Sequence, residues 1–257
     1  MMVSRIKFFI RNLLCNDFVG GIILAFFRKT VPDIRWPGFR FYLRESGTSR
    51  KNVASIFWGF YEAAEIRLIE KYFEGNTDIV ELGGSLGVVS AHIMSKLRPG
   101  KKFIAVEANP HLVNNLLLNV ERFKKNGTHF GIRNNAIQYF VEQARFHISA
   151  DTTGSRVGLA TPDNLHGVSI PATTLSQIVN QELLDNFSLV CDIEGSEIEV
   201  ILLDAGALSK CANLFIELHE VEYNNVRYTP DEMLARLVGD HGFKALARQG
   251  NAVYLTK

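Results

Sequence analysis

Cysteine is scarce in this chain of 257 residues. The three cysteines form no C-x-x-C pair, and their odd number leaves at least one of them without a disulfide partner in the chain. This usage is typical of a reducing compartment, so we expect a cytoplasmic protein rather than a secreted one built on disulfides. The seven histidines are scattered and no H-E-x-x-H motif is present, so the sequence predicts no zinc ligands.

An excess of charge of one sign is also missing. The 28 lysines and arginines are nearly balanced by 27 acidic residues, which gives a formal net charge of +1. Proteins bind the phosphate backbone of nucleic acids largely through electrostatic attraction, so this balance argues against nucleic acid as a main partner. The hydrophobic share of 47% is that of an ordinary globular protein with a sizeable core.

No hydrophobic run is long enough to span a membrane. The longest clean run near the N-terminus, residues 19–27, contains two glycines, whereas a spanning helix needs roughly 20 apolar residues. No small-x-small cleavage site follows it, which argues against a secretory signal. Apolar residues do recur at helical spacing between residues 6 and 14. We favour a helix docked on the rest of the protein. The alternative is peripheral contact of residues 1–29 with the inner face of a membrane.

Beyond this segment, strands and helices alternate. Residues 1–50 are predicted to form a helical and extended segment, with a short strand or hairpin at 31–43, and residues 51–257 to form one α/β domain. Short apolar strands between helices indicate a doubly wound, mostly parallel sheet whose ligand crevice lies beyond the carboxyl ends of its strands. Residues 145–172 interrupt the alternation as an inserted hairpin or lid. The predicted strands are 78–82, 102–106, 131–137, 188–192, 214–218 and a closing antiparallel hairpin, 243–247 with 252–255; the predicted helices are 61–73, 87–97, one opened by Asn109-Pro110, 197–203 and 230–238.

A glycine turn follows the first of these strands. The run Glu81-Leu82-Gly83-Gly84-Ser85-Leu86-Gly87 allows a tight turn and close approach of a ligand to the next helix. A dinucleotide fingerprint would need glycine where Ser85 and Val88 stand, so the nicotinamide pattern fails. The pattern that remains is acidic-x-Gly-x-x-x-Gly, in which Glu81 can accept a hydrogen bond from a cationic ligand group.

The second strand ends at Glu107, about 20 residues beyond Gly87. At this distance a carboxylate in a doubly wound fold meets a ribose diol. The alternative is a solvated glutamate at a strand end. Because Glu107 follows a glycine turn, we favour ribose binding.

Polar residues also follow the next two strands. Asp192 ends a buried strand, and it could serve as a base, a metal ligand or a clamp on a cofactor. Glu194 and Glu197 follow closely. For Glu197 we favour the simple interpretation of an acidic residue in the first turn of a helix. On the neighbouring strand His219 stands two residues after Glu217, beside the expected position of Asp192, which makes it a candidate base.

Taken together, these motifs resemble the FkbM-type methyltransferases over about residues 57–222. The resemblance implies a class I methyltransferase fold with a seven-stranded sheet, S-adenosylmethionine as donor, and a hydroxyl acceptor on a sugar, glycan or secondary metabolite. The sequence departs from the family's usual Asp-x-Gly-Ala-Asn-x-Gly at Glu81, Gly84 and Ser85. Gly84 in place of Ala and Ser85 in place of Asn keep a small or polar residue at those positions. The markers are Tyr61-Glu62, DIVELGGSLG at 78–87, AVEANP at 105–110, TTLSQIV at 173–179, LVCDIEGSE at 189–197 and IELHE at 216–220. The implied cofactor residues are Glu81, Gly83, Gly84, Ser85, Gly87, Glu107, Ala108, Asn135 and Ala136, the last two at the adenine.

Methyl transfer from a sulfonium is an in-line displacement with a neutral leaving group, so alignment and desolvation matter most. A neutral alcohol is a poor nucleophile, and a base or metal is expected beside it. We nominate Asp192 and His219, with Glu194 in reserve, and leave a divalent metal open. The competing hypotheses are a nicotinamide-dependent oxidoreductase or epimerase, a nucleic-acid methyltransferase, and a cofactor-binding protein without catalysis. Residues 149–171 carry no recognisable signal for the acceptor.

Overall fold

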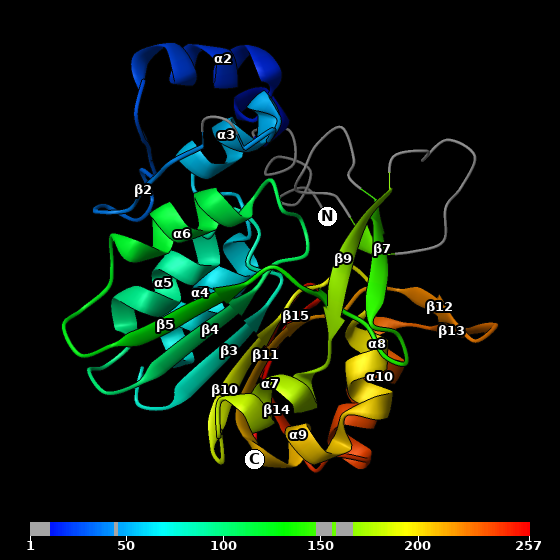
Figure 1. Ribbon diagram of the computed structural model, residues 1–257. Coiled ribbons are helices and arrows are strands. Elements are labelled where there is room, and N and C mark those ends of the chain that lie inside the picture. Colours follow the sequence, from blue (N-terminus) through cyan, green and yellow to red (C-terminus); the bar gives the residue numbers. More distant parts are fainter. Residues whose placement is uncertain (1–10, 44–45, 148–155, 158–166) are drawn as a thin grey trace.

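A seven-stranded sheet forms the centre of the protein in a computed structural model, which describes residues 11–43, 46–147, 156–157 and 167–257 (Figure 1). Its strand order is β14-β15-β11-β10-β3-β4-β5. Neighbouring strands from β11 to β5 run parallel, and β15 runs antiparallel to both of its neighbours, β11 and β14. The predicted class I α/β fold is therefore confirmed. The strands are β3 (Asp78–Leu82), β4 (Lys102–Val106), β5 (His129–Arg133), β10 (Phe187–Cys191), β11 (Cys211–Glu217), β14 (Lys244–Gln249) and β15 (Ala252–Thr256).

Helices cover both faces of this sheet. On one face lie α4 (Ala63–Tyr72), α5 (Val88–Lys96) and α6 (Val113–Glu121); on the other lie α7 (Leu175–Gln181), α8 (Glu197–Leu203), α9 (Ala205–Lys210) and α10 (Pro230–Gly239) (Figure 1). Successive strand residues point to opposite faces, so Ile79 packs into the first layer while Val80 and Leu82 pack into the second. This two-sided burial explains why the strands read as continuous apolar runs.

Two predicted helix starts were wrong. The helix expected at Asn109-Pro110 begins only at Val113, because the Asn109 side chain accepts a hydrogen bond from the backbone N of His111 at 3.0 Å and closes a turn first. The helix expected at residue 61 begins at Ala63, since Glu62 has a φ of +45°, outside the helical region. By contrast, α10 begins at Pro230 as predicted, and Thr229 and Glu232 form a capping box at its N-terminus.

The strand predicted over 131–137 is in fact two strands. β5 ends at Arg133, and β6 (Ala136–Ile137) joins a second sheet of order β6-β9-β7-β8. Asn134 separates them, because its side-chain Nδ2 donates to the backbone oxygens of Glu107 and Ala108 at 2.8 and 3.1 Å. The predicted inserted hairpin is confirmed, with β7 (Gln143–His147) antiparallel to β9 (Gly167–Thr173) and a short β8 (Arg156–Val157). Most of the lid expected at 149–171 lies outside the described residues.

The N-terminal segment packs against the first helical layer. It contains α2 (Asp17–Phe26), the antiparallel pair β1 (Val31–Pro32) and β2 (Arg40–Phe41), and α3 (Arg50–Phe57). The β1–β2 pair confirms the hairpin expected at 31–43. Of the helix expected from residue 6, only 11–14 are described, and they are helical. None of the described helices is long and apolar enough to cross a membrane.

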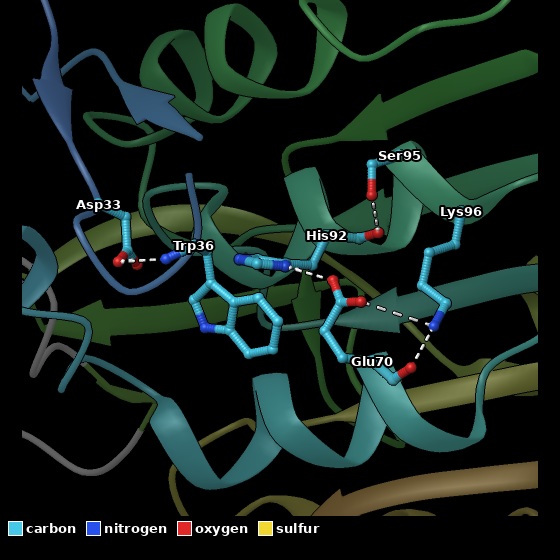
Figure 2. A network of polar contacts seen from close by, with 6 residues as sticks. All are labelled: Asp33, Trp36, Glu70, His92, Ser95 and Lys96. Atoms are coloured by element: carbon cyan, nitrogen blue, oxygen red, sulfur yellow. Dashed lines mark hydrogen bonds and ion pairs between the residues drawn. The ribbon is translucent and has the colours of Figure 1, made fainter. Parts of the chain in front are cut away.

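A buried histidine fixes this segment in place (Figure 2). The His92 ring on α5 stacks on Phe39 at 3.8 Å between centroids and meets the edge of Trp36 at 5.4 Å. Its Nδ1 lies 2.6 Å from a carboxylate oxygen of Glu70 on α4, and Lys96 pairs with the same carboxylate. Aromatic packing and an anchored imidazole therefore join the hairpin to two core helices.

Candidate active site

The glycine turn lies at the carboxyl end of β3 and is shaped by what surrounds it. The backbone N of Gly83 and that of Gly84 both donate to the Val106 oxygen, at 2.9 and 3.0 Å. Gly83 has a φ of +91°, and a Cβ there would come within 1.8 Å of the Asp192 oxygen. Gly87 has a φ of +79° and lies against α6. Only glycine allows the backbone of this turn to pass so close to the backbone of Asp192.

Glu107 holds the turn from the neighbouring strand. One carboxylate oxygen accepts a hydrogen bond from the backbone N of Ser85 at 2.7 Å, and the other accepts one from Asn109 at 2.6 Å. Burial raises the pKa of Glu107, while these backbone bonds oppose the rise. A carboxylate has about four acceptor positions, so Glu107 can still accept a hydrogen bond from a hydroxyl group of a ligand. The structure thus places Glu107 beside the turn, as ribose binding requires.

Glu81 lies beneath the turn rather than at its surface. Its carboxylate accepts a hydrogen bond from the Ser90 hydroxyl on α5 at 2.5 Å. Burial raises its pKa well above the ordinary value, with further contributions from the charges of Glu62 and Glu107. Its expected contact with a cationic ligand group stays a prediction.

The remaining predicted cofactor residues follow β4 and β5. Ala108 follows Glu107 and is half-buried, and Ala136 is buried at the start of β6. Asn135 donates from its side chain to the Pro171 oxygen at 3.2 Å. The cofactor residues inferred from the sequence therefore follow the ends of three adjacent strands, β3, β4 and β5, at one edge of the sheet.

A histidine surrounded by carboxylates lies at the ends of the next two strands. His219 Nδ1 is 3.1 Å from a Glu197 oxygen and 3.9 Å from Asp192 Oδ1, while its Nε2 is 3.9 Å from a Glu194 oxygen. The structure therefore brings together all three nominated catalytic residues. It adds Glu197, which sequence reasoning had interpreted only as an acidic residue in the first turn of a helix.

Glu197 lies in the first turn of α8, as predicted, but the expectation that it has no further role was wrong. Its side chain is fully buried, and it also accepts hydrogen bonds from the backbone N atoms of Ile193 and Gly195 at 2.9 and 2.8 Å. The carboxylate thus folds back from the start of α8, closes the loop that carries Glu194 and orients His219. The spacing of Glu197 two residues after Gly195 could have suggested this, because a first-turn carboxylate can reach back to preceding amide groups.

The charges in this cluster influence one another. The hydrogen bond to Glu197 raises the pKa of His219 to about 9, and burial opposes the rise. Burial raises the pKa of Asp192 to about 8, assisted by the charge of Glu217 and opposed by that of His219. Asp192 Oδ1 is buried without a hydrogen bond. Groups with such shifted pKa values can exchange protons near neutral pH.

The start of α4 adds two acidic residues that sequence reasoning did not assign to the site. The Tyr61 hydroxyl lies 3.3 Å from the Ser85 hydroxyl of the glycine turn. Glu62 is the residue just before α4, and Glu65 is buried in the first turn of α4 with Oε1 lacking a hydrogen bond. Burial raises the pKa of both glutamates well above the ordinary value, and the charge of Asp192 contributes next. They therefore lie within electrostatic reach of Asp192.

This surplus of carboxylates fits a ligand with cationic groups. S-adenosylmethionine has two such groups, a sulfonium and an ammonium. A metal ion fits less directly. Asp192, Glu197 and His219 could each offer one ligand atom, with all of these atoms within 4.8 Å of one another. However, His219 Nδ1 and Glu197 are already bonded to each other, and an ion would have to displace that bond.

Comparison with solved structures finds matches of low sequence identity. The structure of EvdMO1 matches with a TM-score of 0.43 and 12% identity over 88% of this chain and 44% of that chain, so this chain spans less than half of its length. Magnesium protoporphyrin IX methyltransferase (ChlM) from Synechocystis PCC 6803 with bound SAH matches with a TM-score of 0.41 and 7% identity over 75% of this chain and 79% of that chain. Sp1610 from Streptococcus pneumoniae, a putative tRNA (m1A22) methyltransferase, matches with a TM-score of 0.39 and 12% identity over 74% of this chain and 68% of that chain.

Comparison of the sequence with curated proteins gives no significant match. The sequence model described as "Methyltransferase FkbM domain", in contrast, matches residues 83–245, which is more than half of the chain and includes the glycine turn, Glu107 and the His219 cluster. This match sets aside the nicotinamide-dependent alternative. The chain belongs to the FkbM methyltransferase domain family and is an S-adenosylmethionine-dependent methyltransferase.

Proposed function

We propose that the enzyme methylates a hydroxyl oxygen on a sugar, a glycan or a secondary metabolite. The observation that supports this most is the His219 imidazole held by Glu197 beside Asp192, near the glycine turn. A hydroxyl must lose its proton as it attacks a methyl group, and an imidazole with a fixed orientation can accept that proton. The bond at Nδ1 leaves Nε2 for the acceptor.

We assign the cofactor to the edge formed by β3, β4 and β5. Glu107 would accept hydrogen bonds from the ribose hydroxyls, and Ala108, Asn135 and Ala136 would border the adenine. The bound cofactor supplies an activated methyl group on a cationic sulfur. The carboxylate of Glu62 would stabilise that positive charge and the ammonium, because it lies near the acidic groups of Asp192, Glu217 and Glu194.

The protonation state of His219 limits this reaction. With a pKa of about 9, the imidazole is mostly protonated at neutral pH and cannot accept a proton. A nearby cationic sulfonium lowers the pKa of an imidazole by repulsion, so cofactor binding favours the neutral form. The proton then passes from the acceptor hydroxyl to Nε2, and Glu197 and Asp192 stabilise the imidazolium that forms.

The chemistry of the product tests this proposal. The purified protein would be incubated with methyl-labelled S-adenosylmethionine and a panel of sugars, glycans and hydroxylated metabolites, and the labelled products identified by mass spectrometry. We expect one added methyl group in a linkage that resists mild alkali, as an ether does. A label released by mild alkali would indicate a methyl ester, and a label on nitrogen would indicate an amine acceptor. Either result would contradict the proposal.

A further inference from the structure

Helix α2 exposes a ridge of large apolar side chains. Phe18, Ile22 and Phe26 are 78%, 44% and 80% exposed, and their spacing of four residues places them along one side of the helix. Leu13, in the helical turn just before, is 62% exposed. Single exposed apolar residues are common on protein surfaces, but an aligned row with two phenylalanines is a continuous patch. We name Phe18, Ile22 and Phe26 the α2 ridge.

The opposite side of α2 is fixed to the protein. Gly20 packs so closely on α3 that a Cβ there would come within 1.9 Å of the Arg50 oxygen. Ile23 is buried in the core, and the Asp17 carboxylate accepts a hydrogen bond from the backbone N of Lys51 at 3.0 Å. Figure 1 shows α2 above α3, on the side away from the sheet. The α2 ridge therefore faces outward in a fixed orientation.

The composition of α2 does not suit an aqueous surface. Its sequence, DFVGGIILAF, has one charged residue, and the inner and outer sides are both apolar. A helix that faces water on one side carries polar residues there, whereas a helix that is apolar all round is buried or contacts lipid. The α2 ridge therefore needs a covering surface.

The charges around the ridge indicate which surface. Arg11 precedes α2, Arg28 and Lys29 follow it, all three are exposed, and Asp17 is the one acidic residue in 11–29. Arg50 lies beside Phe18 and Ile22, with which it lines a shallow groove. Basic side chains at the ends of an apolar helix match an anionic membrane surface, where headgroups pair with the charges and apolar side chains enter the acyl boundary.

We propose that α2 docks this enzyme on an anionic lipid bilayer. The helix lies in the plane of the interface, the α2 ridge enters the boundary between headgroups and acyl chains, and the flanking arginines and lysine contact lipid phosphates. A second copy of the chain is a poorer occupant. The ridge offers about 400 Å² of exposed side chain, about half of what one partner contributes to a standard interface. Two such surfaces would also bring like charges together.

Sedimentation with vesicles tests the docking. The full-length protein would be mixed with vesicles of phosphatidylcholine alone and of phosphatidylcholine with phosphatidylglycerol. We expect binding to the anionic vesicles and a decrease of about tenfold or more for Phe18→Ser/Phe26→Ser. Phe140→Ser is the matched control, because Phe140 is 88% exposed on a different surface loop, and it should bind as the wild type does. Arg28→Gln/Lys29→Gln should weaken binding about fivefold per charge.

Three results would overturn the proposal. The wild-type protein could fail to sediment with either kind of vesicle, or Phe18→Ser/Phe26→Ser could bind as the wild type does. Light scattering could also show a dimer that the same double variant converts to a monomer, which would make the ridge a self-association surface. Retained binding of S-adenosylmethionine by each variant would show that its domain is folded.

Discussion

Glu197 accepts a hydrogen bond from His219 Nδ1 at 3.1 Å while the same carboxylate closes the loop between β10 and α8. One buried group thus fixes both the orientation of the imidazole and the backbone that carries Glu194. Because Glu197 acts through His219, we describe it as a positioning residue.

The first prediction concerns Glu197→Gln. The amide keeps the shape but removes the charge that raises the pKa of His219, so the rise of the methyl-transfer rate with pH should move to lower pH. Maximal turnover should fall about tenfold or more because the imidazole is held less well. Glu199→Gln, in the same helical turn, is the control and should keep the wild-type profile. An unmoved profile for Glu197→Gln, with turnover intact, would remove the positioning role.

The wild-type pH profile is the second prediction. A base works only when it has lost its proton, so kcat/KM should rise as pH increases from neutral towards the pKa of His219 at about 9 and then level off. For kcat the rise should come at lower pH, because the bound cofactor is cationic. Initial rates across this range, in buffers of constant ionic strength, provide the measurement. A profile that is flat or falls over this range contradicts the assignment.

Glu107 provides the third prediction. Replacement by Ala removes the acceptor proposed for the ribose hydroxyls, and affinity for S-adenosylmethionine should fall by about 1.5–3 kcal/mol. The demethylated product carries the same ribose and should lose a similar amount. Calorimetry measures both affinities, and thermal unfolding shows whether the turn still folds without the bond to Ser85. Unchanged affinity in a folded variant would place the ribose elsewhere.

The fourth prediction uses Glu65, whose carboxylate is buried with Oε1 lacking a hydrogen bond. Its folded-state pKa is raised, so between the ordinary and the folded pKa the carboxyl is ionised in the unfolded chain but still protonated in the folded protein. Ionisation therefore favours the unfolded chain, and the loss of stability grows from the ordinary pKa until the folded pKa is reached. Glu65→Gln should therefore raise the free energy of unfolding of the ligand-free protein at neutral pH by about 1–3 kcal/mol. The gain should disappear in acid, where the wild-type carboxyl is protonated in both the folded and the unfolded state. A variant that melts below the wild type at neutral pH would contradict this argument.

Much of the fold could be predicted because its signals are local. The runs at 78–82 and 102–106 are apolar strands buried on both faces, and the structure has strands at those positions. The break at Asn134 was missed although polar residues stand at 133–135, because its cause is a pair of side-chain hydrogen bonds to residues that follow a different strand. Local pattern cannot reveal such a long-range contact.

The candidate site divides in the same way. Asp192 and His219 were found because strand ends at one edge of a parallel sheet lie together. Glu65 and Glu197 were missed because helical periodicity gives acidic residues to solvent or to a helix terminus, whereas here both carboxylates are buried. Their environment depends on residues distant in sequence, because α4 packs against β11 and β15 and Glu197 is bonded to His219, which follows β11.

The central claim is that His219 and Asp192 support methyl transfer from S-adenosylmethionine without being needed to bind it. One measurement tests this claim most directly. His219→Ala and Asp192→Asn would be assayed for cofactor affinity by calorimetry and for turnover with an acceptor found in the panel. We expect nearly wild-type affinity and a loss of turnover of about 10²–10⁴-fold, as is typical when a general base is removed. Wild-type turnover in both variants would contradict the account and place the base elsewhere.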